Sequence, residues 1–595
     1  MIKLLKRMRR QEALMALLCA VLVGVQVYFD LRLPDFMTQL TTLIKTPGSA
    51  TADILSVGAQ MLGCTLASAV LAVGCGFLAA KTASGFSFTV REQLFHHVMD
   101  VGSEEMQDFS VPSLITRTTN DITQIQMIVA MGLQMLIKAP IMAVWAVIKI
   151  LGKSWELSAV TAGCVVALCV MVFAIMSTCL PRFRLVQKLT DKINRVAREN
   201  LTGINVVHAF GAEDYQNRKF DGPSRDMMNL QLKNQRLFAL LQPMLGFGMN
   251  GLALAVYWVG AALVESIALT DPAARLTMFT NVLVFSTYAT YVVMSFMMLV
   301  MIFMLVPQAQ VSAERINEVL DTKPHVVPGA KTEGSGTGTV EFRDVSFRYP
   351  NTETYALRHV SLRFRIGERL AVVGMNGSGK TTFIKLLCRL YDPTEGVILL
   401  NGVDIRKYNY DEYLSIFSVV FQDFRLFSFS LGQNVAAGAE YDRERAVSCL
   451  REAGFGERLD RMPEGLETSL YQDFDKAGME ISGGEAQKIA LARALYKNAP
   501  FIVLDEPTAA LDPVSEYEVY RKFNEISGGR TAVYISHRLA SCRFCDEILV
   551  FHEGQIVQHG AHEALLAESG GKYAELWNAQ AQYYTDAQAG AEAEV

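Results

Sequence analysis

The stretch Gly374-Met-Asn-Gly-Ser-Gly379-Lys380-Thr381 decides the fold of the second half of the chain. It matches the pattern G-x-x-x-x-G-K-[ST], follows the strand-like Leu370–Val373 and precedes the helical Thr382–Leu390. Glycines in such a loop let backbone N–H groups converge on phosphate oxygens, and the positive end of the helix dipole adds to the attraction. The stretch therefore predicts an α/β domain of the P-loop NTPase type that binds ATP.

The side chains at the end of this loop have separate expected roles. Lys380 is expected to reach the β- and γ-phosphates and Thr381 to ligate Mg²⁺. The expected ATP-binding residues of the loop are Gly374, Asn376, Gly377, Ser378, Gly379, Lys380, Thr381 and Thr382.

A second apolar strand, Phe501–Leu504, runs directly into Asp505 and Glu506. Such a strand brings Asp505 beside the phosphate loop, where its carboxylate can hold Mg²⁺. Glu506 is then placed to orient or deprotonate the water that attacks ATP. The alternative is an ordinary buried strand followed by a solvated acidic turn. A complete phosphate loop in the same domain favours the catalytic interpretation.

Between these two motifs lies Ser482-Gly483-Gly484-Glu485, followed by the helical QKIALARAL. By itself, an SGG turn before a helix indicates only a helix start. In this order with the other two motifs it resembles the signature of ATP-binding cassette transporters, and the resemblance covers about residues 1–580. The family usually has Gln where this chain has Glu485, and a carboxylate near a nucleotide weakens binding according to its proximity.

The resemblance assigns four further residues to the nucleotide site. It implies that Tyr349 stacks on adenine and that Gln422 contacts Mg²⁺ and relays the nucleotide state to the membrane domain. It also implies that Asp512 communicates across a dimer and that His537 holds the γ-phosphate. The alternatives are a strand-edge tyrosine and a packed or solvated histidine.

The first half of the chain has the composition of a membrane domain. The whole chain is 51% hydrophobic and 19% charged, and the apolar excess lies almost wholly before residue 306. A bilayer-crossing helix needs about 20 mostly apolar residues. Six segments qualify, at about 13–31, 55–80, 128–151, 155–180, 238–266 and 277–306. The fold class is therefore an all-α six-helix membrane domain, of the exporter type by the resemblance, followed by the α/β ATPase domain.

The distribution of basic residues predicts the orientation in the cell membrane. Lys and Arg are frequent before residue 13 and within 181–237, whereas the opposite connections carry only Arg32, Lys45, Lys153 and Arg275. Basic loops stay in the cytoplasm. Both termini and the ATPase domain are therefore expected on the cytoplasmic side of a multi-pass membrane protein. The net charge of −5 without a basic tract indicates no nucleic-acid partner.

Several membrane-half features have more local interpretations. Ile2–Glu12 is expected to form a basic amphipathic helix at the membrane surface. The long segments 81–127 and 181–237 are interpreted as membrane helices prolonged into the cytoplasm. Lys138, Lys149 and Glu265 are expected to snorkel to the membrane surfaces. The alternative for Lys138 is a place on a polar translocation pathway.

The domain boundaries follow from composition and from the resemblance. We expect a membrane domain at 1–323, a Pro- and Gly-rich linker at 324–337, the ATPase domain at 338–580 and a flexible tail at 581–595. The resemblance implies coupling helices, which rest on an ATPase domain, at about 111–121 and 208–220.

The resemblance also implies the mechanism. In the family, ATP is held between the Lys380 loop of one subunit and the Ser482 loop of another, so the chain needs a second half-transporter subunit, itself or a relative. The expected function is ATP-driven export of a hydrophobic or amphipathic substrate, such as a drug, lipid or peptide, by alternating access. The resemblance points to bacterial exporters and a Gram-positive host. The alternatives are an iron-chelate importer on the same scaffold and an ATP-gated channel or regulator; six fused spans exclude a soluble cassette ATPase.

Overall fold

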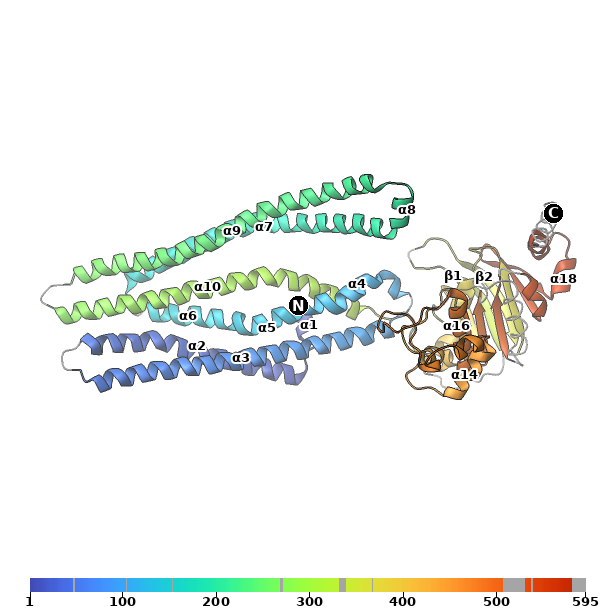
Figure 1. Cartoon of the computed structure of the whole chain (residues 1–595), viewed down its shortest axis with the longest axis horizontal. Helices are drawn as coiled ribbons and strands as arrows, with labels where there is room; N and C mark the ends of the chain where they lie inside the picture. Colours follow the sequence, from blue (N-terminus) through green and yellow to red (C-terminus); the bar gives the residue numbers. More distant parts are fainter. Residues whose placement is uncertain are drawn as a thin grey trace. The chain divides into compact units, whose positions relative to one another are not determined.

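A computed structural model describes most of the chain, namely residues 1–45, 49–102, 104–151, 154–267, 271–330, 339–350, 352–365, 367–506, 530–536 and 539–580. The chain forms two compact units (Figure 1). Met1–Val98 and Val111–Asp321 make the helical unit, and the ATPase unit contains Met99–Ser110 and the chain from Thr322 onward. Asp512, His537, the linker residues 331–337 and the tail 581–595 lie outside the described residues.

The helical unit is built from long α-helices joined by short connections. Its helices are α1 (Ile2–Leu5), α2 (Arg10–Lys45), α3 (Thr51–Asp100), α4 (Val111–Thr116), α5 (Ile122–Met131), α6 (Ile137–Leu151), α7 (Trp155–Thr202), α8 (Ile204–Ala209), α9 (Glu213–Glu265) and α10 (Pro272–Asp321). The π-helical segments η2 (Arg117–Asp121) and η3 (Gly132–Leu136) connect α4, α5 and α6 into one continuous helix. Six helices of this unit are long and apolar enough to cross a bilayer, which confirms the expected count.

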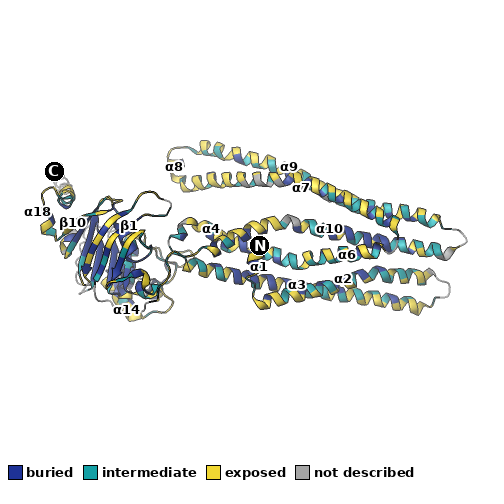
Figure 2. Cartoon of the chain, turned by 180° about the vertical axis from the view of Figure 1, so that it is seen from behind, coloured by how far each residue is buried: buried dark blue, intermediate teal, exposed yellow. Residues whose placement is uncertain are grey.

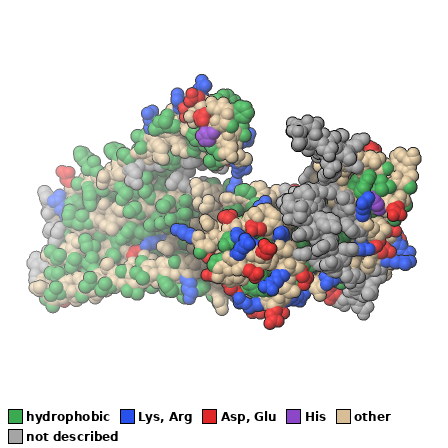
Figure 3. All heavy atoms as spheres, turned by 45° about the vertical axis from the view of Figure 1, so that its right-hand side comes forward, with side chains coloured by type: hydrophobic (Ala, Val, Ile, Leu, Met, Phe, Trp, Pro, Cys, Tyr) green, Lys and Arg blue, Asp and Glu red, His purple; other side chains and the backbone are tan. Residues whose placement is uncertain are grey.

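The membrane helices are much longer than a bilayer requires. Helix α3 has 50 residues and α9 has 53. At about 1.5 Å per residue each measures about 75–80 Å, whereas the hydrocarbon core is about 30 Å thick. Figure 3 shows the visible face of this unit largely covered by hydrophobic side chains, and Val73, Phe77, Phe173 and Trp258 are among the exposed ones. Such a surface is typical of lipid contact, while the remaining helix length extends beyond the bilayer.

The short segments at the helix ends differ from the expectation. Val111–Asp121 is the start of the third long helix rather than a separate short helix, and the break falls before it, around Gly102. Arg117 is buried there and donates a hydrogen bond to the carbonyl oxygen of Arg315 (2.8 Å). Between α7 and α9 the short helix α8 covers Ile204–Ala209, not 208–220, because Gly203 and Gly211 bracket it and α9 begins at Glu213.

The N-terminal segment is also different from the expected amphipathic helix. Helix α1 ends at Leu5, and α2 begins only at Arg10. The basic residues of this N-terminal segment pair with acidic side chains of the same unit: Lys3 pairs with Asp321 (2.6 Å) and Arg9 with Glu92 (2.6 Å). The positive charges therefore bind the helix bundle, which removes the reason to expect a continuous helix lying on lipid.

Charged side chains within the spans form ion pairs. Lys138 of α6 lies 3.1 Å from the Asp30 carboxylate of α2, and Lys149 lies 2.7 Å from that of Asp35. Asp30 also accepts a hydrogen bond from Ser68 of α3. The Tyr288 hydroxyl of α10 donates to Asp35 (2.7 Å). Both lysines therefore have a counter-charge on a neighbouring helix, which lowers the cost of a cation within the spans, and snorkelling to the membrane surfaces stays a prediction.

The ATPase unit contains two sheets. The antiparallel sheet has the order β2 (Leu357–Arg365), β1 (Thr339–Phe347), β4 (Glu395–Leu400) and β5 (Val403–Asp404). The second sheet has the order β10 (Gln555–Gly560), β9 (Glu547–His552), β3 (Arg369–Gly374), β8 (Thr531–Ile535), β7 (Phe501–Asp505) and β6 (Phe417–Val420). Strands β9, β3, β8, β7 and β6 are parallel. Their carboxyl ends therefore meet at one edge, where ligands bind in α/β folds.

The helices of the ATPase unit cover and connect these sheets. They are α11 (Lys380–Leu387), α12 (Tyr410–Ser415), α13 (Leu431–Ala436), α14 (Arg443–Glu452), α15 (Gly456–Asp460), α16 (Gly483–Lys497) and α18 (His562–Ala567). Short 3-10 helices occur at η1 (Glu105–Asp108), η4 (Ile405–Lys407), η5 (Gly465–Glu467) and η6 (Leu539–Phe544).

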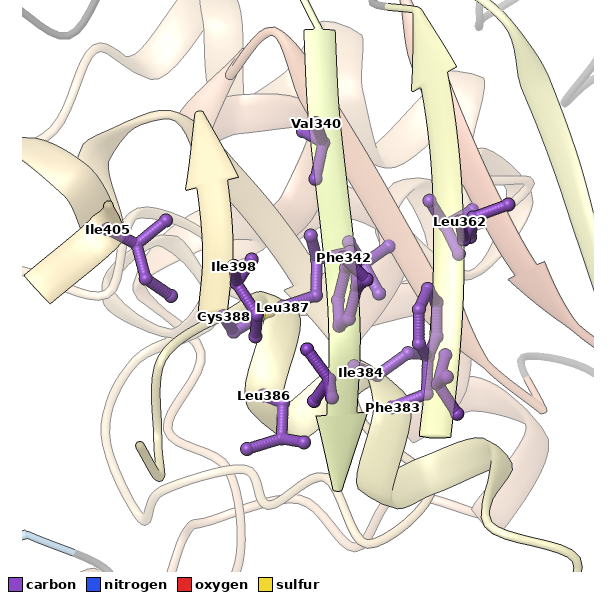
Figure 4. Close-up of a cluster of buried hydrophobic side chains, with 14 of the residues drawn as sticks. Val340, Phe342, Leu362, Phe383, Ile384, Leu386, Leu387, Cys388, Ile398 and Ile405 are labelled. Carbon is purple, nitrogen blue, oxygen red and sulfur yellow. The ribbon is translucent and has the colours of Figure 1, made fainter. Parts of the chain in front are cut away.

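Helix α11 lies in the centre of the main hydrophobic core. Phe383 and Leu387 of this helix are buried with Phe342 of β1 and Leu362 of β2 (Figure 4). The same core includes residues of the parallel strands, such as Val503, and Figure 2 shows the strands as largely buried. Packing against both sheets fixes the position of the helix whose first residue is Lys380.

The Lys138–Asp30 pair gives a first test. Lys138→Ala leaves the Asp30 carboxylate without its counter-charge within the bundle, so we expect a loss of up to about 3 kcal/mol of stability. Thermal unfolding in detergent micelles measures this loss. Adding Asp30→Asn removes the unpaired charge and should restore most of the stability. A double variant as unstable as the single one would contradict the assigned pairing.

Candidate nucleotide-binding site

The phosphate loop connects β3 to α11 and has no room for side chains at its two ends. Gly374 has φ +151°, and a Cβ there would lie 2.3 Å from the carbonyl oxygen of Phe551. Gly379 has φ +105°, and its Cβ would lie 2.8 Å from the carbonyl oxygen of Ala356. Glycine is therefore required at both positions, and the backbone between them can approach a ligand closely.

Lys380 begins α11 and folds back over the loop. Its Nζ donates hydrogen bonds to the carbonyl oxygens of Gly374 (2.9 Å) and Met375 (3.0 Å). Burial lowers the pKa of Lys380, and the nearby carboxylates of Glu506 and Asp505 oppose that shift. The ammonium group is thus held at the loop, within reach of phosphates bound there.

Asp505 lies at the carboxyl end of β7 and is buried. Burial raises the pKa of Asp505 to about 6; the Thr381 hydroxyl opposes this, and the charge of Glu506 adds to it. Neither carboxylate oxygen has a hydrogen-bond partner of ordinary geometry among the described residues. Two unsatisfied buried oxygens beside a threonine hydroxyl are a donor set that suits a hard cation such as Mg²⁺.

Glu506 follows in a left-handed backbone conformation, with φ +52°. Its side chain accepts a hydrogen bond from Nε2 of Gln422, which follows strand β6 (2.8 Å). A positive φ is uncommon for a non-glycine residue and costs backbone energy. This geometry aims the Glu506 carboxylate at the same opening as Gln422.

Lys380, Gln422 and Glu506 line one cavity of about 450 Å³, whereas Gly374 and Asp505 are not among its lining residues. It is lined by Tyr349, Ala356, Asn376, Gly377, Ser378, Gly379, Lys380, Thr381, Thr382, Gln422 and Glu506. The Tyr349 hydroxyl lies 3.1 Å from that of Thr382. The structure thus brings together side chains that are more than 150 positions apart in the sequence, from Tyr349 to Glu506.

Ser482, Gly483 and Gly484 do not line this cavity. Ser482 is the N-cap of α16, and a capping box connects it to Glu485. Farther along α16, Nε2 of Gln487 donates to the carbonyl oxygen of Glu506 (3.4 Å). The signature turn itself is therefore not part of the cavity of its own chain.

Two residues near these motifs were not expected from the sequence. Ala356 lines the cavity because β2 passes beside Gly379, a contact that no sequence pattern signals. Arg458 of α15 lies 2.9 Å from the Glu485 carboxylate. Arg458 precedes Glu485 by 27 positions and shares no motif with it, so the sequence did not predict this contact.

The raised pKa of Asp505 gives a second test, in the nucleotide-free protein. The ordinary value is 3.8 and the folded value about 6, so the folded state binds the proton more tightly. This proton binding stabilises the folded state fully below pH 3.8, and the stabilisation is lost as pH rises through about 6. It amounts to at most about 3 kcal/mol of unfolding free energy. We expect Asp505→Asn to reduce the loss of thermal stability between about pH 4 and 7. An unchanged pH profile in this variant would show that Asp505 does not titrate in this range.

Comparison with known proteins agrees with this geometry. The ABC transporter transmembrane region model matches residues 14–296, and the ABC transporter model matches residues 357–509. An uncharacterised ABC transporter ATP-binding protein of Mycobacterium tuberculosis is 33% identical over 529 residues, which cover 87% of this chain and 88% of that protein. An ATP-dependent lipid A-core flippase of Aromatoleum aromaticum is 30% identical over 502 residues, covering 84% of this chain and 81% of the flippase.

The fold has a close counterpart among solved structures. A bacterial Atm1-family ABC exporter with ATP bound superposes with a TM-score of 0.77 at 23% identity, covering 96% of this chain and 99% of the exporter chain. The helical unit and the ATPase unit therefore each have the fold seen in this exporter. The chain belongs to the ABC transporter family, as an ATP-binding, multi-pass membrane protein with the exporter fold and its ATPase domain in one polypeptide.

Proposed function

We propose that this chain is one half of a dimeric pump that uses ATP and Mg²⁺ to export a hydrophobic or amphipathic molecule by alternating access. The observation that carries the proposal is the cavity in which the phosphate loop, Tyr349, Gln422 and Glu506 meet, in a chain with six membrane helices. Such a cavity combines a phosphate loop, an aromatic ring and a carboxylate, the kinds of group that ATP binding and hydrolysis use.

Each side chain of the cavity has a role in this proposal. The Tyr349 ring stacks on adenine, the backbone of Asn376–Gly379 binds phosphate oxygens, and Lys380 leaves its carbonyl partners for the β- and γ-phosphates. Thr381, Gln422 and Asp505 would hold Mg²⁺, which would neutralise charge on the phosphates. Glu506, oriented by Gln422, positions the attacking water and accepts its proton. His537 and Asp512 keep the roles implied by the family.

The position of Ser482 supports a dimer. Its turn lies outside the cavity of its own chain, and a helix N-terminus with free N–H groups is suited to phosphate oxygens. We propose that it contacts the ATP held by the Lys380 loop of a second subunit, which is another copy or a related chain. Each ATP then links two chains, so that binding closes the ATPase domains and hydrolysis separates them.

The connection between α7 and α9 is suited to transmit this closure. At its tip, Val206 and Phe210 are 60% and 81% exposed, although both are apolar. Exposed apolar side chains at the end of long helices indicate a docking surface. We propose that α8 rests on an ATPase domain, so that the helices α7 and α9 follow its motion. In this arrangement, both termini and the ATPase domain are cytoplasmic, as the basic residues favour.

A lipid or another amphipathic molecule is the substrate class that we propose. Relatives about 30% identical over most of the chain are named lipid A-core flippases. The Asp30–Lys138 pair adds a polar group to otherwise apolar spans, as a substrate with a polar head requires. Import of an iron chelate and ATP-gated channel activity have no comparable support in the described residues.

Replacing the proposed general base tests the catalytic assignment. Glu506→Gln keeps the hydrogen-bonding shape but cannot accept a proton, so we expect ATP binding to persist and turnover to fall about 100-fold or more. ATPase activity of the complex in liposomes, measured together with retained ATP, reports both. Gln433→Glu is the control: it adds a negative charge at a half-buried position of α13 outside the cavity, where a glutamate side chain can keep the hydrogen bond to the backbone N–H of Ser430. Normal turnover in Glu506→Gln would refute this role.

A further inference from the structure

Glu485 accepts the hydroxyl hydrogen of Ser482 in the signature turn. Its Oε2 accepts hydrogen bonds from the backbone N–H of Ser482 and from Oγ of Ser482, both at 2.9 Å. The same Oγ accepts a hydrogen bond from the backbone N–H of Glu485 (3.4 Å). A hydroxyl group has a single hydrogen to donate. The Ser482 hydrogen therefore points at Glu485 and not at an outside acceptor.

Glu485 also brings a negative charge to a turn that faces a ligand of the same sign. Burial raises the pKa of Glu485, but the hydrogen bonds from Ser482 and the positive charge of Arg458 outweigh it, so the net shift is downward. The carboxylate is thus ionised at neutral pH. A triphosphate approaching Ser482 meets this charge at short range, where repulsion is strongest.

Arg458 is the counter-charge on the far side of this carboxylate. Its Nε lies 2.9 Å from Oε1 of Glu485, the oxygen that Ser482 does not use. The guanidinium also contacts Sδ of Met479 through Nη2 (3.5 Å), which holds it beside the turn. The side chains of Arg458 and Glu485 are 38% and 26% exposed, so the pair is partly shielded from solvent.

We propose that Arg458 is a positioning residue for ATP, which neutralises Glu485 so that the Ser482 turn can accept the triphosphate of the opposing subunit. This inference rests on the proposed function, in which Ser482 contacts that ATP. Arg458 itself touches no nucleotide; it acts through the carboxylate. A chain with Gln in place of Glu485 has no charge to compensate and gains an amide that can donate to Oγ of Ser482. The hydroxyl hydrogen of Ser482 is then free to donate to a phosphate oxygen.

The test is a double-variant cycle on the full complex in liposomes, with KM for ATP and kcat measured separately. Arg458→Ala should raise KM about three- to ten-fold and change kcat by less than about two-fold, a range discounted for the partial exposure of the pair. Glu485→Gln should lower KM below that of the wild type. The combination of both changes should give the KM of Glu485→Gln alone. Arg458→Lys keeps the charge and should restore most of the affinity.

Arg461→Ala is the matched control. Arg461 follows the same short helix, its side chain is 75% exposed, and its acidic neighbour Glu457 is 4.0 Å away. This variant should leave KM unchanged. Thermal unfolding of every variant separates a folding defect from a change in affinity.

Two results would overturn the inference while leaving the proposed function intact. One is a wild-type KM in Arg458→Ala. The other is a rise of KM on adding Arg458→Ala to Glu485→Gln that is as large as the rise on adding Arg458→Ala to the wild type. That result would assign Arg458 a structural role. A wild-type complex that neither binds nor hydrolyses ATP would instead contradict the proposed function, and this inference with it.

Discussion

Close approach of backbone to backbone around the phosphate loop constrains everything else in the ATPase unit. The carbonyl oxygens of Phe551 and Ala356 lie so near Gly374 and Gly379 that neither position accepts a Cβ atom. Phe551 of β9 and Leu357, the first residue of β2 directly after Ala356, belong to one hydrophobic core, in which α11 is buried. The core therefore fixes the conformation of the phosphate loop. The loop in turn fixes the backbone positions of Lys380 and Thr381, the first two residues of α11.

Desolvation of charged groups is the second feature of the site. Burial shifts the pKa of Lys380 downward and that of Asp505 upward, so each group is destabilised in its ionised form without a ligand. In the proposed function, a bound nucleotide and Mg²⁺ would supply the missing counter-charges. This electrostatic cost in the empty site gives a physical reason for the site to favour the bound state.

The fold and most of the cavity followed from the sequence because they depend on local patterns. Apolar runs predict membrane helices, and the glycine loop and the Asp505–Glu506 strand end predict which residues meet. Contacts between distant segments could not be predicted this way. The pairing of Lys138 with Asp30, the course of β2 past Gly379 and the approach of Arg458 to Glu485 depend on tertiary packing, which no spacing rule encodes. The bounds 208–220 that the resemblance implied run across Gly211, whereas the structure places the short helix α8 at Ile204–Ala209, between Gly203 and Gly211.

The proposed pump requires that one ATP molecule is held by two chains. Two variants test it: Lys380→Ala, which removes the phosphate-binding amine, and Ser482→Arg, which blocks the signature turn. Dimers containing one chain of each kind can be isolated through two different tags, and the ATP that they retain can be counted. If the sites are shared, one site of each mixed dimer is intact, so it should retain ATP although dimers of either variant alone do not. Mixed dimers as empty as the parent variants would contradict the claim.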